Sequence, residues 1–231
     1  LVAGCSSGKG TTVNSGEKSV TFSLLSSPAS LDPATTTDGS SLMVETQLFS
    51  MLVDSKGGNS SEIKPDIAES WDISEDGLTY TFKLRDDVYF HNGKLLTADD
   101  VVYTFNRVMT EPYTSYYAAP IKSVEATDEH TFVAHLNYPF ADFLTLIGGI
   151  YFGICCEEAI TAGSDFMYKP VGTGPYKLEG GYIPGQAFKF VYNDQYYGAE
   201  PDIKEINFKI QPDTNTAVIS LQNGEVDFIP A

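Results

Sequence analysis

The sequence predicts a mixed α/β (α+β) fold in which strands and helices follow one another irregularly around a mixed sheet. Hydrophobic residues make up 42% and aromatic residues 13% of the 231-residue chain, which is enough for a packed core. Segments with apolar residues at every second position are interspersed with segments at helical spacing. Because these do not repeat as strict strand–helix–strand units, we expect both parallel and antiparallel pairing.

The N-terminal half should contain two strands and two helices. Residues 20–25 alternate as a strand, and the prolines after them mark an irregular loop. Residues 42–53 carry apolar side chains at helical spacing, so we expect a helix there. The clearest strand is 78–84. A second helix should begin after Thr97, which can cap it together with Asp100 three residues later.

The C-terminal half should alternate short strands with short helices. Expected strands are 121–126, 131–136, 176–180, 188–192 and 206–210, and expected helices are 141–147, 157–162 and 214–223. Gly224 ends the last helix, as glycine commonly does after a helical C-terminus.

The charge of the chain limits its partners. Asp and Glu number 31 against 14 Lys and Arg, giving a formal net charge of −17. Nucleic-acid binding depends mainly on Lys and Arg contacts to phosphates, so a nucleic-acid partner is not expected. An acidic, self-repelling surface suits a protein that works outside the cytoplasm.

The first residues predict attachment to a membrane through lipid. Small residues precede Cys5 in the sequence LVAGCSS, which resembles a bacterial lipobox. In such a sequence the cysteine thiol receives the diacylglyceryl group. Polar Ser, Gly and Thr residues follow, so we interpret residues 1–18 as lipobox and flexible tether. A free cysteine in a disordered tail is the alternative.

Motifs of catalysis and metal binding are not found in the sequence. It contains no hydrolase elbow, zinc-protease motif or kinase set. The segment Asp72–Gly77 begins like a calcium loop, but Lys83 stands where a bidentate Glu is required, so we interpret it as a polar turn. The three histidines are interpreted as solvated or turn residues. No catalytic residue, metal site or cofactor is therefore expected.

Five segments in order resemble the family 5 extracellular solute-binding proteins of ABC importers, the oligopeptide, dipeptide and nickel group. They are SLDP at 30–33, KPDIAESW at 64–71 with DGLTYTFKLR at 76–85, FHNGKLLTADDVVY at 90–103, PVGTGPY at 170–176 and LQNGEVD at 221–227. The resemblance extends over about residues 20–231. One segment alone would be weak support, but five in the same order are specific.

The resemblance implies a periplasmic-binding-protein-like lobe split by an inserted smaller α+β subdomain. We expect the first lobe to comprise residues 19–48 and 155–231, and the inserted subdomain residues 49–154. Members of the family are roughly twice this length, beyond one ordinary domain. The second lobe and the returning segment are therefore expected to be missing from this chain.

The implied function is capture of a solute between two lobes, without chemistry, and delivery to a permease. We expect a lipid-anchored, extracytoplasmic monomer that binds oligopeptides or dipeptides and contacts ABC permease subunits. Main-chain pairing at the loop after the first strand would grip a peptide irrespective of its side chains. The candidate ligand-binding residues are Ser27, Pro28, Ala29, Tyr116, Tyr117 and Thr173.

Each candidate also has an ordinary structural explanation, with Pro28 as a turn residue and the tyrosines as packing residues. Three alternatives for function stay open, one of them a stand-alone adhesion or scaffold module. A binder of nickel, haem or a sugar derivative would belong to the same family. A lipid-tethered hydrolase would be a different class, and the sequence favours it less.

Overall fold

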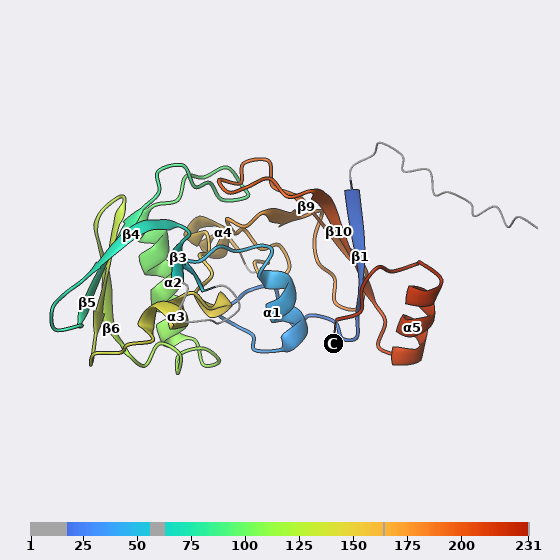
Figure 1. Ribbon diagram of the computed structural model, residues 1–231, viewed down its shortest axis with the longest axis horizontal. Helices are drawn as coiled ribbons and strands as arrows, with labels where there is room; N and C mark the ends of the chain where they lie inside the picture. The colour runs from blue at the N-terminus through green and yellow to red at the C-terminus, as the bar shows by residue number, and fades with distance from the viewer. Residues whose placement is uncertain (1–17, 56–62, 164, 231) are drawn as a thin grey trace, which may run out of the picture.

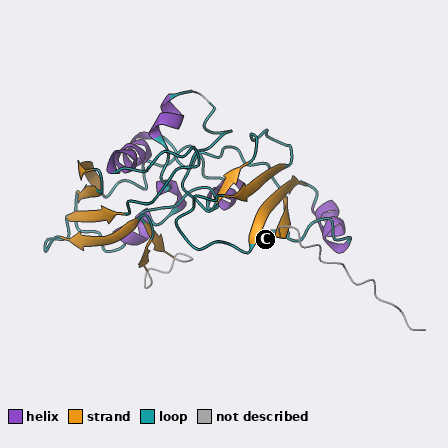
Figure 2. Ribbon diagram, turned by 90° about the horizontal axis from the view of Figure 1, so that it is seen from above, coloured by secondary structure: helices purple, strands orange, loops and turns teal. Residues whose placement is uncertain are grey.

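The computed structural model describes residues 18–55, 63–163 and 165–230. Cys5 and nearly all of the predicted tether lie outside the described residues. Two groups of elements lie at opposite ends of an elongated molecule (Figures 1 and 2). We call them the mixed-sheet unit and the antiparallel unit.

The mixed-sheet unit is built on a four-stranded sheet with the order β1-β10-β9-β8. Strand β1 runs parallel to β10, and the other two pairs are antiparallel, which confirms the predicted mixed sheet. Its elements are β1 (Lys18–Leu24), α1 (Gly39–Glu45), α4 (Glu157–Thr161), β8 (Tyr176–Leu178), β9 (Phe188–Tyr192), β10 (Ile203–Ile210) and α5 (Thr214–Gln222).

The antiparallel unit is built on a sheet with the order β4-β5-β7-β6. Helix α2 packs on β6 and β7. The unit comprises β2 (Val53–Ser55), β3 (Ile63–Pro65), β4 (Ala68–Ile73), β5 (Thr79–Leu84), α2 (Ala98–Thr110), β6 (Ile121–Asp128), β7 (Thr131–Leu136), α3 (Phe143–Ile147) and the 3-10 helix η2 (Ile150–Phe152).

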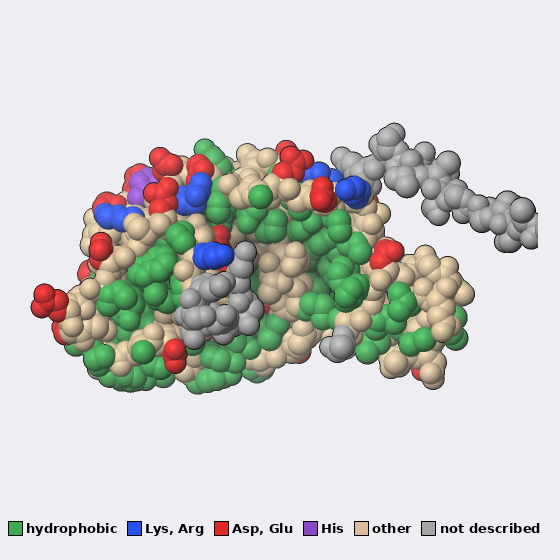
Figure 3. All heavy atoms as spheres, viewed as in Figure 1, with side chains coloured by type: hydrophobic (Ala, Val, Ile, Leu, Met, Phe, Trp, Pro, Cys, Tyr) green, Lys and Arg blue, Asp and Glu red, His purple; other side chains and the backbone are tan. Residues whose placement is uncertain are grey.

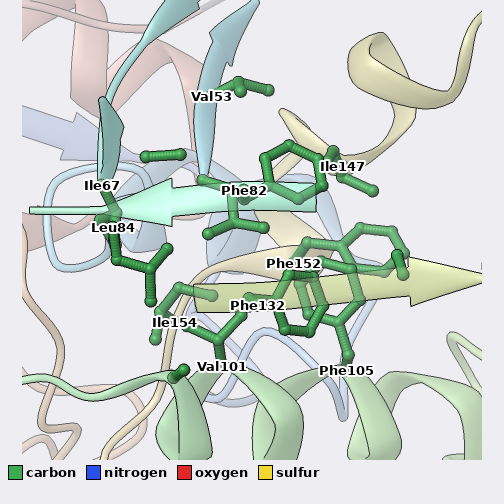
Figure 4. Packing of buried hydrophobic residues seen from close by; sticks show 14 of the residues in the cluster. Val53, Ile67, Phe82, Leu84, Val101, Phe105, Phe132, Ile147, Phe152 and Ile154 are labelled. Carbon is green, nitrogen blue, oxygen red and sulfur yellow. The ribbon is translucent and has the colours of Figure 1, made fainter. Parts of the chain in front are cut away.

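Each unit has its own cluster of buried apolar side chains. In the antiparallel unit, Phe105 of α2 packs on Phe132 of β7 and on Phe152, with ring centroids 4.7 and 5.0 Å apart (Figure 4). In the mixed-sheet unit, Phe188 stacks on Phe208 at 4.7 Å. Burying one such side chain contributes about 2–3 kcal/mol. The chain passes between the clusters near residues 49–52 and 154–156. The subdomain boundaries at 48/49 and 154/155 stay a proposal.

The predicted start of the second helix is confirmed. Thr97 precedes α2 as its N-cap, and a reciprocal capping box joins it to Asp100. The Asp100 carboxylate accepts hydrogen bonds from the Thr97 N–H and hydroxyl at 3.1 and 3.2 Å. These bonds satisfy donors that the first helical turn leaves free.

The predicted helix over residues 42–53 is wrong in its length. Helix α1 ends at Glu45, because the next carbonyls bond elsewhere. The Gly174 N–H donates to the Leu48 carbonyl at 2.9 Å, and the Tyr176 N–H donates to the Gln47 carbonyl at 3.1 Å. A Cβ on Gly174 would lie 2.5 Å from the Leu48 carbonyl carbon, so only glycine allows this approach.

Strand β4 was not predicted, because its exposed polar residues hide the alternation. Its hairpin with β5 turns at the segment that resembles a calcium loop. There the Asp76 carboxylate accepts hydrogen bonds from the Ser74 hydroxyl at 2.6 Å and the Leu78 N–H at 3.0 Å. The segment is a polar turn, as predicted.

The acidic composition is visible on the surface. Asp and Glu side chains gather along the upper edge of the face in Figure 3, and hydrophobic side chains spread over its lower part. No helix among the described residues has the length and apolar composition to cross a membrane.

Candidate ligand-binding site

The loop at residues 27–29 is held from behind by hydroxyl groups. The Tyr182 hydroxyl donates to the Pro28 carbonyl at 2.6 Å and lies 2.6 Å from the Ser27 hydroxyl oxygen. The Gly185 N–H donates to that same Ser27 oxygen at 2.8 Å. Tyr182 is only 3% exposed, so the loop is fixed to the interior of the mixed-sheet unit.

Helix α1 fixes the other end of loop 27–29. The Ser41 hydroxyl oxygen accepts from the Ala29 N–H at 3.0 Å, and its proton goes to the Asp38 carboxylate at 2.5 Å. Asp38 also caps the helix by accepting from the Ser41 N–H. Although burial favours the neutral form, hydrogen bonds from Ser41 and Thr36 keep the pKa of Asp38 below its usual value. The anchor is thus a carboxylate at neutral pH.

These contacts leave particular main-chain groups of loop 27–29 available. Pro28 has no N–H, its carbonyl is occupied, and the Ala29 N–H is occupied. Within the described part of the chain, the Ser27 N–H and carbonyl and the Ala29 carbonyl have no hydrogen-bond partner. Ala29 is exposed. An extended peptide could pair with these groups in the manner of an added strand.

The next residues, 31–34, hold the two units together, and we call them the clamp. The Asp32 carboxylate pairs with the Arg107 guanidinium of α2 through two bonds of 3.0 and 2.7 Å. Their side chains are 6% and 15% exposed. The Thr114 hydroxyl, which is buried, donates to the Ala34 carbonyl at 3.1 Å. This bidentate, largely desolvated geometry is the strong form of an ion pair.

Tyr116 and Tyr117 lie in a series of turns between α2 and β6, in the same segment as Thr114. Their ring centroids are 4.0 Å apart, and Tyr117 stacks on Tyr151 at 4.2 Å and 21°. Tyr116 is 61% exposed. The three rings form a ladder with an open aromatic face at Tyr116, and the Thr114 bond connects this segment to the clamp.

Thr173 has a different environment from the other predicted residues, since it has no exposed surface. Its hydroxyl accepts from the Ser50 N–H at 3.4 Å. We therefore assign Thr173 to the junction between the units and leave it out of the proposed ligand contacts.

His91 is also part of that junction. Its Nδ1 accepts from the Gly172 N–H at 3.3 Å, and its Nε2 donates to the Gly174 carbonyl at 3.2 Å. The first bond requires an unprotonated Nδ1, so the ring is the neutral Nε2–H tautomer. Burial lowers the pKa of His91 to about 4; the Gly174 carbonyl opposes this shift and Lys177 adds to it. The interpretation of His91 as a turn residue is correct, and the side chain is half-buried.

Glu45 is a buried acid at the end of α1. It is 0% exposed, and within the described residues neither carboxyl oxygen has a hydrogen-bond partner. Burial, followed by the negative charges of Asp32 and Asp38, raises its pKa to about 9. The side chain is therefore protonated at neutral pH. The described residues contain no group of three or more His, Cys, Asp or Glu side chains arranged to hold a metal ion.

The structure thus joins some predicted residues and separates others. Ser27, Pro28 and Ala29 form one anchored loop, and Tyr116 and Tyr117 are connected to its continuation through the clamp. Sequence reasoning did not identify Tyr182, Ser41 or Arg107, because each acts on the loop or clamp over a long sequence separation. The only sequence signal was the SLDP motif itself, whose aspartate needs a partner once it is buried.

Comparison with known proteins extends this description. A family model described as bacterial extracellular solute-binding proteins, family 5 middle, matches residues 62–231. The chain belongs to this family. Heme-binding protein A of Haemophilus influenzae is 34% identical over 229 residues, which cover 87% of this chain and 42% of that protein. Oligopeptide-binding protein AppA of Bacillus subtilis is 30% identical over 212 residues, covering 84% and 38%.

A solved structure agrees with the fold. The ABC transporter-associated periplasmic binding protein DppA from Helicobacter pylori, in complex with the peptide STSA, matches with a TM-score of 0.81 and 31% identity. The match covers 90% of this chain and 45% of that one. The expected periplasmic-binding-protein-like lobe is confirmed. The chain spans less than half the length of the relatives it matches.

Proposed function

We propose that this chain forms one wall of an extracytoplasmic solute-binding protein that captures peptides and delivers them to an ABC importer. The observation that carries the proposal is the bonding of loop 27–29. Its Pro28 carbonyl and Ala29 N–H are bonded, whereas the Ser27 N–H and carbonyl and the Ala29 carbonyl have no partner within the described residues. Such a surface recognises the backbone of a peptide, which every peptide shares. Closure against a second lobe would bury the peptide.

The tyrosine ladder would contribute aromatic contact to the same ligand. Tyr116 offers an open ring face, supported from behind by Tyr117 and Tyr151. The same face would also suit a planar macrocycle, so haem is the second candidate ligand. The 34% identity to heme-binding protein A supports keeping it. Nickel and sugar derivatives are weaker alternatives, since no observation in the described residues favours either.

Attachment to the membrane through lipid on Cys5 is part of the proposal. The mass of the intact protein, extracted from the membrane of its own cells, should equal that of a chain starting at an acylated Cys5. An unmodified cysteine, or a chain that starts before residue 5, would contradict the anchor.

The ligand is tested by thermal shift on the full-length protein that contains this chain. A library of tri- to pentapeptides should raise the melting temperature, because ligand binding stabilises the folded state. Haem and Ni²⁺ are run in parallel. A shift with haem or Ni²⁺ and none with peptides would overturn the peptide proposal.

A matched pair of variants connects the shift to the loop. Ala29→Trp places a large ring on the exposed loop and should abolish the shift with peptides. Thr37→Trp makes the same change at another exposed position of the irregular segment after β1 and should keep it. If peptides raise the melting temperature of both variants equally, the peptide does not bind at loop 27–29.

A further inference from the structure

The hydrogen bonds behind loop 27–29 form a chain with one direction. The Tyr182 proton goes to the Pro28 carbonyl, so in the bond between the two hydroxyls Ser27 must be the donor. The Ser27 oxygen in turn accepts from the Gly185 N–H. Each hydroxyl therefore donates once and accepts once, and the chain is complete.

The phenol at the centre of this chain is held by the core. The Tyr182 ring packs edge-on against Phe188 of β9, with centroids 5.1 Å apart and an interplanar angle of 74°. Tyr168 lies on another side, with its centroid at 6.4 Å. Phe188 belongs to the central aromatic cluster of the mixed-sheet unit. The ring that carries the hydroxyl is thus packed against the sheet.

We propose that Tyr182 is a positioning residue for peptide capture, acting on the ligand through Pro28 and Ser27. The inference rests on the proposed capture of peptides at loop 27–29. Proline already fixes φ at position 28, and Tyr182 fixes the orientation of the peptide group that follows. Ser27 is held through the two bonds of its hydroxyl, while its N–H and carbonyl have no partner among the described residues.

This arrangement would lower the cost of binding. A flexible loop must lose conformational freedom when a peptide pairs with it, and that loss reduces affinity. A loop that Tyr182 already fixes loses most of its conformational freedom when the protein folds, before the peptide binds. The hydroxyl therefore raises affinity for the peptide main chain without contacting the peptide.

The first test compares two matched variants of the full-length protein. Tyr182→Phe removes the hydroxyl and keeps the ring. Tyr168→Phe makes the same change in the same cluster, at a hydroxyl that has no hydrogen bond to the loop within the described residues. The probe is the tightest-binding member of the tri- to pentapeptide library, titrated by calorimetry. We expect Kd to rise about tenfold in Tyr182→Phe, as for one lost hydrogen bond, and to change less than about twofold in Tyr168→Phe.

The second readout separates positioning from general destabilisation. Analogues of the same peptide, each N-methylated at one main-chain nitrogen, lose the donor needed for pairing. Wild type should bind the analogue methylated at the pairing nitrogen about tenfold more weakly than the parent. In Tyr182→Phe this penalty should shrink, because the loop no longer holds its pairing orientation. A merely structural role would lower stability and leave the penalty unchanged.

The outcomes distinguish the two proposals. Wild type that binds no peptide of the library overturns the proposed function and, with it, the role of Tyr182 in peptide capture. Wild type that binds, with unchanged Kd and unchanged N-methyl penalty in Tyr182→Phe, overturns only the positioning role. If Tyr182→Phe does not fold, Ser27→Ala opens the same chain from the loop side and is judged by the same two readouts.

Discussion

Loop 27–29 and the clamp at residues 31–34 are neighbouring stretches of one segment, and their polar groups have different kinds of partner. The loop bonds directly to the Tyr182 and Ser41 hydroxyls and to the Gly185 N–H, with the Asp38 carboxylate behind Ser41. Some of its main-chain groups have no partner within the described residues. The clamp is buried, with Leu31 at 0% and Asp32 at 4% exposed. It is bonded to Met167 through the Leu31 N–H at 3.0 Å and to Arg107 through an ion pair.

The difference indicates that the short segment of residues 27–34 serves two purposes. The clamp fixes the mixed-sheet unit against the antiparallel unit, so that the loop before it starts from a rigid base. Substitutions in the clamp should therefore affect stability, and substitutions in the loop should affect ligand binding. The predictions below test that division, from the largest expected effect to the smallest.

Removal of Arg107 should have the largest effect on stability. Arg107→Ala leaves the Asp32 carboxylate buried without its partner, which typically costs about 3–5 kcal/mol. Urea unfolding at pH 7 measures the loss. Lys169→Ala, which removes an exposed pair with Asp165, is the control and should leave the unfolding midpoint essentially unchanged. Similar midpoints for both variants would contradict the role of the clamp.

Replacement of Glu45 by glutamine should raise the free energy of unfolding at neutral pH. Its pKa is raised to about 9 in the folded chain, against 4.5 as its usual value, so the folded state keeps a proton that the unfolded chain releases above pH 4.5. The stability it contributes is present below that pH and is lost as the pH rises toward 9. Glu45→Gln should therefore be about 2–3 kcal/mol more stable than wild type at pH 7.

The gain from Glu45→Gln should fall to about 0.4 kcal/mol at pH 4.5, where the folded wild type is protonated and its unfolded chain is half protonated. Unfolding free energies at the two pH values provide the comparison. A gain that is equal at pH 4.5 and pH 7 would show that the titration of Glu45 does not cause it.

His91 should give a pH dependence of opposite sign. Its folded pKa is about 4, against 6.5 as its usual value, so between these values the unfolded chain binds a proton that the folded chain does not. Stability should fall as the pH drops from about 6.5 toward about 4, by about 2 kcal/mol at pH 4.5. The slope of unfolding free energy against pH should be shallower in His91→Gln. An unchanged slope would contradict the bond from Gly172 to Nδ1.

Ser41 should give the smallest change in stability among these variants. Ser41→Ala removes the acceptor for the Ala29 N–H and one of the hydrogen bonds that the Asp38 carboxylate accepts. Because Asp38 keeps its bonds from Thr36 and the Ser41 N–H, the expected loss is about 1–2 kcal/mol. Peptide affinity should fall more than this stability loss implies, because loop 27–29 loses one of its two anchors. A stability loss close to that of Arg107→Ala, measured by the same urea unfolding, would remove the distinction between loop and clamp.

Much of the fold could be predicted because its signals are local. The capping box at Thr97 and the alternation in β5, β7 and β9 depend on residues within a few positions of each other. The end of α1 could not be predicted from nearby residues. The Gln47 and Leu48 carbonyls accept hydrogen bonds from the N–H groups of Tyr176 and Gly174, more than 120 residues later in the sequence. Strand β4 was missed because its polar residues face solvent on an edge strand.

The candidate site was predictable in part for the same reason. The resemblance identified residues 27–29 as a loop after the first strand, but nothing near them in sequence indicates Tyr182 or Ser41. The burial of Thr173 follows from the packing of Phe49 and Leu48 around Gly172 and Gly174. The bonds of the His91 ring were not predicted, because its partners Gly172 and Gly174 lie more than 80 residues later in the sequence.

Amide hydrogen exchange of the full-length protein, with and without a saturating peptide from the library, tests the central claim most directly. The Ser27 N–H has no partner within the described residues, so its exchange should be fast without peptide and slow with it. The Leu31 N–H, bonded to the Met167 carbonyl, should be slow in both states. Slow exchange at Ser27 only with peptide would support main-chain pairing at loop 27–29. Unchanged exchange at Ser27 when peptide is demonstrably bound would contradict it.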